Sequence, residues 1–348
     1  KAIELNPKIS EAYSNLGGIL RDLGKLKEAE IFARKAIELN PNFSNPYLNL
    51  GRILYDLGKL KEAELILLKS IELNPDLTGA YYILSNIGAL TSQNKWVDYL
   101  FTNDILESQN DINKIDIYFA RANILERQSN YIQSASMLRK ANNLNRKLYG
   151  SNYIKIKNLM KNYYQIWQGI KSKNLKENLP ISIFIVGLPR SGKTITEAIL
   201  ARNKSVLKCG EDKALSIAVN NYLNPKDNHN NKDLYQIYIA NITKEISGKS
   251  YICSTIPNNF IYTGLIATQL PNSKIIYCFR NPLDNIKEMY AAHFGEKFTF
   301  TTSIVESAKF LLSINELMEE YKRIFSSKIF FLNYDELILN PEKEIKSL

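Results

Sequence analysis

The chain has 348 residues, enough for two domains of ordinary size, and its 45 Lys and Arg exceed its 35 Asp and Glu by a net charge of +10. A basic balance favours anionic partners, but no Lys/Arg-rich run occurs, so nucleic acid is not expected. No apolar run approaches the roughly 18 residues of a membrane span, and the three cysteines lack a C-x-x-C pair. We therefore expect no membrane span, no disulfide framework and a reducing, cytoplasmic compartment.

The first part of the chain is a repeat. Ala2–Pro7 reads AIELNP, Ala36–Pro41 repeats it and Ser70–Pro75 reads SIELNP, which gives a period of 34 residues. Asn-Pro ends the second helix of each unit, because proline cannot continue it. This spacing predicts helix–turn–helix units that stack into a solenoid. Over residues 1–92 the repeats resemble tetratricopeptide repeats (TPR).

Residues 93–173 continue as degenerate helical repeats and a linker. Trp96–Ser108, Asp116–Gln128 and Tyr131–Leu144 read as amphipathic helices, and the polar stretch after Lys171 marks the linker. The TPR resemblance implies a concave groove for a peptide or protein, and a spacer or dimerisation arm is the alternative. The chain begins inside a repeat unit and stops on an unfinished helical pattern, so we expect both ends to be incomplete.

The stretch Ile181–Arg202 carries the clearest chemistry. Ile181–Val186 is a largely apolar strand, and Gly187–Thr194 fits the phosphate-binding pattern G-x-x-x-x-G-K-T at every position. A helical pattern follows. A strand, a glycine loop and a helix together aim free backbone N–H groups at an anion. An ordinary glycine-rich turn is the alternative interpretation.

Residues 174–348 alternate short apolar segments with helical patterns, which predicts a P-loop-like, mostly parallel α/β domain after the solenoid. After the first strand, the expected strands are Lys204–Lys208, Ser250–Thr255, Lys274–Arg280 and Lys328–Tyr334. Ligands of such sheets sit at the carboxyl ends of the strands. We therefore expect the glycine loop, Glu211, Ser254 and Arg280 to lie near one another.

A magnesium-dependent P-loop kinase or nucleoside triphosphatase is one interpretation of the glycine loop. Such enzymes need an acidic metal ligand at the end of a neighbouring strand. The expected strands end instead in Ser254, Arg280 and Tyr334, with Asp335 one residue further on, and no metal-ligand spacing is evident. A strand that ends in Arg280 indicates a second anion away from the loop. A nucleotide with phosphates at both ends of its ribose fits better, without a metal.

Five motifs carry a family resemblance: IFIVGLPRSGKT, CGED, PNNF, KIIYCFRNPLDN and NYDEL. Their order and spacing resemble those of sulfotransferases, and the repeats point to the TPR-containing bacterial branch related to protein-tyrosine sulfotransferases. The resemblance implies transfer of a sulfuryl group from 3′-phosphoadenosine 5′-phosphosulfate (PAPS) to a hydroxyl or amine. The repeats suggest a peptide or protein as the acceptor.

The resemblance also implies roles for individual residues. Glu211 is similar to the general base, and Arg280 is similar to the residue that binds the 3′-phosphate. Lys193 and Arg190 would offset charge during transfer. The residues expected to hold the 5′-phosphosulfate are Leu188, Pro189, Arg190, Ser191, Gly192, Lys193 and Thr194.

Three departures from the family pattern are evident. Lys193 replaces a threonine, Ser254-Thr255 replace an Asp-Lys pair, and Glu288 replaces a serine that contacts the 3′-phosphate. The first two changes are explained if one lysine has moved from position 255 to position 193. Glu288 places a carboxylate beside an expected phosphate, which favours the alternative of a catalytically inactive TPR adaptor.

Overall fold

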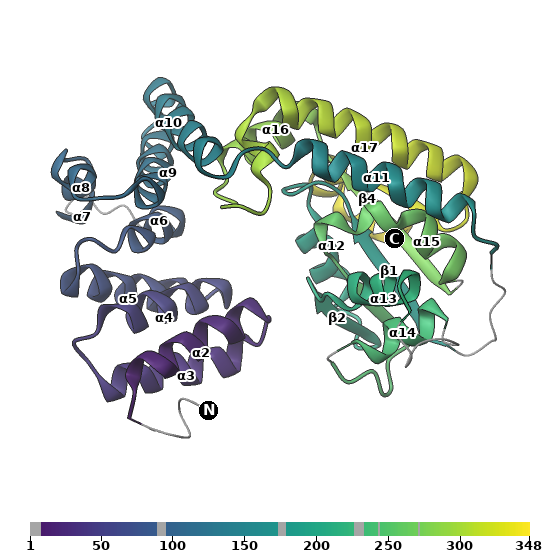
Figure 1. Ribbon diagram of the computed structural model, residues 1–348, viewed down its shortest axis with the longest axis horizontal. Coiled ribbons are helices and arrows are strands. Elements are labelled where there is room, and N and C mark those ends of the chain that lie inside the picture. Colours follow the sequence, from purple (N-terminus) through teal and green to yellow (C-terminus); the bar gives the residue numbers. More distant parts are fainter. Residues whose placement is uncertain (1–7, 89–94, 173–178, 226–232, 243, 271) are drawn as a thin grey trace. The chain divides into compact units, whose positions relative to one another are not determined.

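The computed structural model describes residues 8–88, 95–172, 179–225, 233–242, 244–270 and 272–348. The chain divides into two compact units. Unit 1 contains Lys1–Ser151 and Tyr290–Thr302, and unit 2 contains Asn152–Met289 and Ser303–Leu348. Figure 1 labels many of the elements of both units.

Unit 1 is a series of helix pairs joined by short turns. Gly24 and Gly58 take the same left-handed conformation, with φ 74°, in the turns of two successive pairs, so the sequence repeat is also a geometric repeat. The core of these first pairs is formed by small and aliphatic side chains such as Ala33, Leu50 and Ala63. The helices are α2 (Ser10–Asp22), α3 (Leu26–Leu39), α4 (Ser44–Asp56), α5 (Leu60–Leu73), α6 (Thr78–Ile87), α7 (Lys95–Leu100), α8 (Asp104–Glu107), α9 (Asp111–Arg127) and α10 (Tyr131–Tyr149).

The expected helix Trp96–Ser108 is divided into α7 and α8. The buried Arg121 of α9 donates from Nε to Leu100 O at 2.8 Å and from Nη2 to Thr102 O at 2.7 Å. These two carbonyls lie at the break, so a guanidinium from another helix supplies the hydrogen bonds that a continuous helix would have made.

The segment Tyr290–Thr302 packs in unit 1 although it follows most of the α/β domain in sequence. The His293 ring stacks on Phe119 with centroids 4.9 Å apart, and its Nε2 lies 3.1 Å from Asp116 Oδ1. Asn142 Nδ2 donates to Tyr290 O at 2.8 Å. The segment ends in the short 3-10 helix η3 (Thr299–Thr302), whose residues are all buried.

Unit 2 is built on a five-stranded sheet of order β2-β3-β1-β4-β5, and every neighbouring pair is parallel. The strands are β1 (Ile181–Val186), β2 (Val206–Gly210), β3 (Tyr251–Ser254), β4 (Ser273–Phe279) and β5 (Ile329–Asn333). The predicted solenoid followed by a mostly parallel α/β domain is therefore confirmed.

The helices of unit 2 lie between and around the strands. In Figure 1, α11 and α17 run side by side, and their Tyr164 and Tyr321 rings are 5.8 Å apart. The elements are α11 (Tyr153–Gln168), α12 (Lys193–Leu200), α13 (Ala214–Leu223), α14 (Leu234–Ala240), η2 (Pro257–Tyr262), α15 (Thr263–Gln269), α16 (Pro282–Ala291), α17 (Ile304–Ile324), α18 (Tyr334–Leu339) and α19 (Pro341–Ser347).

The three cysteines, Cys209, Cys253 and Cys278, are buried and free. Among the helices of the described residues, none combines the length and the apolar composition that a membrane crossing requires.

Candidate functional site

The glycine loop leaves β1, the central strand, and passes directly over β4. Gly187 has φ 144°, and a Cβ added there would lie 2.3 Å from Cys278 O. Gly192 has φ 94°, and its Cβ would lie 2.2 Å from a ring carbon of Tyr334. Neither position has room for a side chain, so both glycines of the motif are required by backbone conformation and by contact.

The loop ends at the N-terminus of α12, with Gly192 as the residue before the first helical turn. Within the described residues, the amides of Gly192, Lys193 and Thr194 make no backbone hydrogen bond. Such amides carry the positive end of the helix dipole and favour a bound anion. The local structure is therefore suited to a phosphate or sulfate group.

Lys193 lies inside the turn of the loop and is 6% exposed. Its Nζ donates to Leu188 O at 2.5 Å. Burial lowers the pKa of Lys193 to about 8, and the neighbouring Cys278 and Glu211 act weakly in the opposite direction. An anion bound beside this amine would favour its charged form.

Arg280 follows β4, and one of its donor groups makes no hydrogen bond to the described residues. Its Nε is buried without a hydrogen-bond partner among the described residues, and its Nη1 reaches Arg190 O only at 3.5 Å. The guanidinium lies over the Tyr334 ring, with Cζ 5.3 Å from the ring centroid. A buried N–H group without a partner is costly unless a ligand or water accepts from it.

Helix α16 contacts the loop through two side chains. Asn285 Nδ2 donates to Pro189 O at 2.9 Å, and Glu288 Oε2 lies 3.4 Å from Arg190 Nη2. The ion pair is partly exposed, at 56% for Arg190 and 37% for Glu288, so it contributes about 1 kcal/mol or less. Glu288 therefore pairs with an arginine that was expected to contact the donor.

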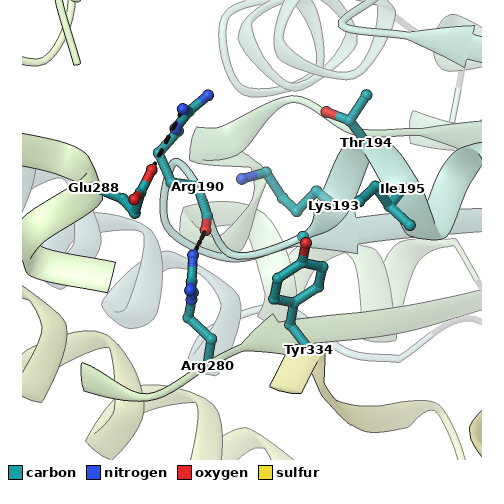
Figure 2. Close-up of a pocket in the computed structure, with 8 residues that line it drawn as sticks. Arg190, Lys193, Thr194, Ile195, Arg280, Glu288 and Tyr334 are labelled. Atoms are coloured by element: carbon teal, nitrogen blue, oxygen red, sulfur yellow. Dashed lines mark hydrogen bonds and ion pairs between the residues drawn. The ribbon is translucent and has the colours of Figure 1, made fainter. Parts of the chain in front are cut away.

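These groups surround one cavity of about 350 Å³, shown in Figure 2. Three cationic side chains face it against one carboxylate, so its potential favours an anionic ligand. The lining residues are Arg190, Gly192, Lys193, Thr194, Ile195, Arg280, Glu288 and Tyr334.

Not all of the predicted site residues line this cavity. Leu188, Pro189 and Ser191 are buried. The Leu188 carbonyl accepts from Ser191 Oγ at 2.8 Å as well as from Lys193, so these residues shape the loop from within. Glu211 is exposed and lies outside the lining, although its charge acts on the pKa of Lys193. The roles assigned to all of these residues stay predictions.

Gly210, the residue before Glu211, is hydrogen-bonded through both its N–H and its C=O. Gly210 N donates to Glu197 Oε1 at 2.7 Å, and Thr255 N donates to Gly210 O at 2.9 Å. Glu197 is 2% exposed, and burial raises the pKa of its carboxyl. The departure at Thr255 therefore lies at a buried position where the backbone supports the loop of Glu211.

Sequence reasoning assigned no role to Glu197, Asn285 or Tyr334. A lone glutamate in an otherwise apolar turn of α12 is the signal that was available for Glu197. Asn285 and Tyr334 lie within the KIIYCFRNPLDN and NYDEL motifs, but their contacts come from elements distant in sequence, which the motifs alone do not indicate. Among the described residues, no three His, Cys, Asp or Glu side chains are grouped to hold a metal ion.

Comparison with family models matches residues 180–348 to the sulfotransferase family. Two tetratricopeptide-repeat models match residues 10–43 and 32–64. Both parts of the predicted resemblance are therefore confirmed.

An uncharacterized protein of Aquifex aeolicus (strain VF5) is 27% identical over 257 residues, which cover 66% of this chain and 33% of that protein. The chain thus spans about a third of the length of this relative. A crystal structure of YrrB, a TPR protein with an unusual peptide-binding site, shares 20% identity at a TM-score of 0.31, and covers 43% of this chain and 83% of YrrB.

Proposed function

The chain carries a sulfotransferase-family domain after tetratricopeptide repeats, and we propose that it transfers a sulfuryl group from PAPS to an acceptor hydroxyl or amine. One observation carries the proposal. Among the described residues, Arg280 has an Nε without a hydrogen-bond partner and the amides of Gly192, Lys193 and Thr194 make no backbone hydrogen bond, and all four residues line the same cavity. They supply two sets of anion-binding groups.

Each set suits one end of such a nucleotide. The amides of Gly192, Lys193 and Thr194 would hold the 5′-phosphosulfate, with Arg190 and Lys193 beside them. Arg280 would bind the 3′-phosphate. The donor supplies a sulfuryl group whose S–O bond to the phosphate breaks as the acceptor oxygen or nitrogen bonds to sulfur.

The proposed roles of the chain in that reaction are electrostatic and acid–base. Lys193 and Arg190 would offset the negative charge that develops on the leaving phosphate oxygen. Glu211 would take the proton of the acceptor, and the hydrogen bond of Gly210 to Glu197 supports its backbone. We expect no metal to be needed, because a sulfuryl group carries less charge than a phosphoryl group.

We propose a peptide or protein as the acceptor or partner. The support comes from unit 1, where side-chain amides donate to main-chain carbonyls. Asn142 donates to Tyr290 O, and Asn145 donates to Gly295 O at 3.4 Å. A further cavity of about 240 Å³ is formed by residues of α2 and α4 and by Phe43, and its lining residues are Glu11, Ser14, Asn15, Phe43, Asn45, Leu48, Asn49 and Arg52. Amide-rich helix faces of this kind suit an extended peptide backbone.

Calorimetric titration tests the donor. Adenosine 3′,5′-bisphosphate should bind with or without magnesium, and more tightly than ATP. Tight binding of ATP that requires magnesium would instead support the kinase or triphosphatase interpretation.

A catalytically inactive TPR adaptor is the second candidate, and the ion pair of Glu288 with Arg190 favours it. It predicts that neither nucleotide binds under any of these conditions. Binding of the bisphosphate by wild type, together with its loss in Arg280→Ala, would argue against the adaptor.

A further inference from the structure

Three consecutive residues where β5 ends act on the turn that follows Arg280. Asn333 Oδ1 accepts from Asp335 N at 3.0 Å and so fixes the start of α18. Asp335 then contacts the turn through its carboxylate, and Tyr334 contacts the guanidinium through its ring. Residues of the motif NYDEL thus contact Arg280 and the backbone that follows it.

The two oxygens of Asp335 have different surroundings. Oδ2 accepts from Asn281 N, the amide directly after Arg280, at 2.5 Å. Oδ1 lies 3.8 Å from Arg280 Nε, which is too far for a hydrogen bond. The carboxylate therefore holds the backbone beside the arginine and forms an ion pair with its guanidinium, while Nε has no hydrogen-bond partner among the described residues.

Tyr334 contacts both parts of the proposed nucleotide site. One contact of its ring is the Arg280 guanidinium, at 5.3 Å from centroid to Cζ. Another is Gly192, where the ring leaves no space for a Cβ. The ring therefore helps to set the distance between the loop that would hold the 5′ end and the arginine that would hold the 3′ end.

We infer that Asp335 and Tyr334 are positioning residues that hold Arg280 ready for a 3′-phosphate, and so determine preference for a nucleotide that carries one. This inference rests on the proposed function. Its physical basis is preorganisation: the arginine is oriented before the ligand arrives, and its donors are not consumed by the groups that orient it.

The test compares adenosine 3′,5′-bisphosphate with adenosine 5′-monophosphate, which lacks the 3′-phosphate. The dissociation constant of the monophosphate divided by that of the bisphosphate isolates the contribution of the 3′-phosphate. In Asp335→Ala we expect the ratio to fall about tenfold, since the turn loses a charge-assisted hydrogen bond. Asp335→Asn should keep most of the preference, because an amide oxygen still accepts from Asn281 N.

A second variant probes the ring. Tyr334→Leu removes the cation–π contact and should lower the same ratio roughly threefold. Asp284→Ala is the matched control for Asp335→Ala, because Asp284 is an exposed acid in the first turn of α16 and its removal changes the charge by the same amount. It should leave the ratio unchanged.

Two results would overturn the inference while leaving the proposed function intact. If Asp335 acts only through its charge, Ala and Asn variants both bind the bisphosphate more tightly. If it only supports folding, both nucleotides weaken together and the ratio stays constant. A wild-type protein without any preference for the 3′-phosphate removes the proposed function, and the inference with it.

Discussion

Lys193 is a buried amine whose protonation is coupled to anything negative that binds beside it. Burial lowers its pKa to about 8, so part of the population is neutral under mildly alkaline conditions. A bound phosphate or sulfate attracts only the charged form. Ligand binding above this pKa must therefore include the uptake of a proton from solution.

The affinity of the wild-type protein for adenosine 3′,5′-bisphosphate should accordingly fall as pH rises above about 8. The expected slope approaches tenfold per pH unit, which is the limit for one proton taken up on binding. Calorimetry between pH 7 and 9.5 measures it, and the heat in buffers of different ionisation enthalpy counts the protons directly.

Lys193→Thr is the control for this titration. It should bind more weakly at neutral pH and show a flat profile over the same range. In the wild-type protein without ligand, stability depends on pH in the opposite direction to affinity. Lys193 in the unfolded state keeps its proton up to its ordinary pKa of 10.5, so the free energy of unfolding rises as pH increases from about 8 to 10.5. A wild-type affinity independent of pH would contradict the proximity of Lys193 to the ligand.

Glu288 should weaken nucleotide binding, because its carboxylate competes for Arg190 and adds negative charge to the cavity. Glu288→Gln should therefore tighten binding of adenosine 3′,5′-bisphosphate roughly two- to tenfold, a size typical of a partly exposed pair. Glu342→Gln, an exposed position on α19, makes the same charge change as a control. Weaker binding in Glu288→Gln would show that the carboxylate helps to build the site.

At the scale of elements, the crossing of the glycine loop over β4 depends on Gly187. Gly187→Ala should lower the free energy of unfolding by roughly 3–5 kcal/mol, because the added Cβ meets the carbonyl of Cys278. Gly248→Ala separates backbone strain from contact, since Gly248 has φ 71° and open space around it. In Gly248→Ala we expect the free energy of unfolding, measured by urea unfolding, to fall by about 1–2 kcal/mol. Equal losses in the two variants would show that the contact with Cys278 O contributes nothing.

Elements with a local pattern were predictable. The repeat period, the glycine loop and the strands are all visible in the sequence, and the expected Lys204–Lys208 differs from β2 by two residues at each end. Apolar runs locate a strand well, but its ends depend on hydrogen bonds to neighbouring strands. The parallel sheet followed from the alternation of strands and helices.

Contacts between distant elements were not predictable. At the break between α7 and α8, two carbonyls accept hydrogen bonds from Arg121 of another helix. The pair of Arg190 with Glu288 joins residues 98 positions apart, and periodicity contains no information about it. At the site, the sequence therefore supplied the residue types but not which donors are occupied, and it gave no role to Tyr334.

The whole molecule has an unusual division of the chain, because unit 1 includes Tyr290–Thr302 from within the α/β part. Segments from both sides of this stretch belong to unit 2. Continuous domain boundaries drawn on the sequence separate this stretch from the helices that it contacts.

His293→Ala tests how firmly unit 1 holds this stretch. The variant loses stacking on Phe119 and the contact with Asp116, so it should destabilise this packing by about 1–3 kcal/mol. Hydrogen exchange of the α9 amides should become faster. Glu296→Ala, exposed on the same stretch, should have no such effect, and unchanged exchange in His293→Ala would show that the packing contributes little.

This division of the chain limits how such proteins are recombined. Grafting a foreign repeat array onto the α/β part would leave thirteen residues, 290–302, without the helices that they fit. A successful chimera must therefore exchange that loop along with the array.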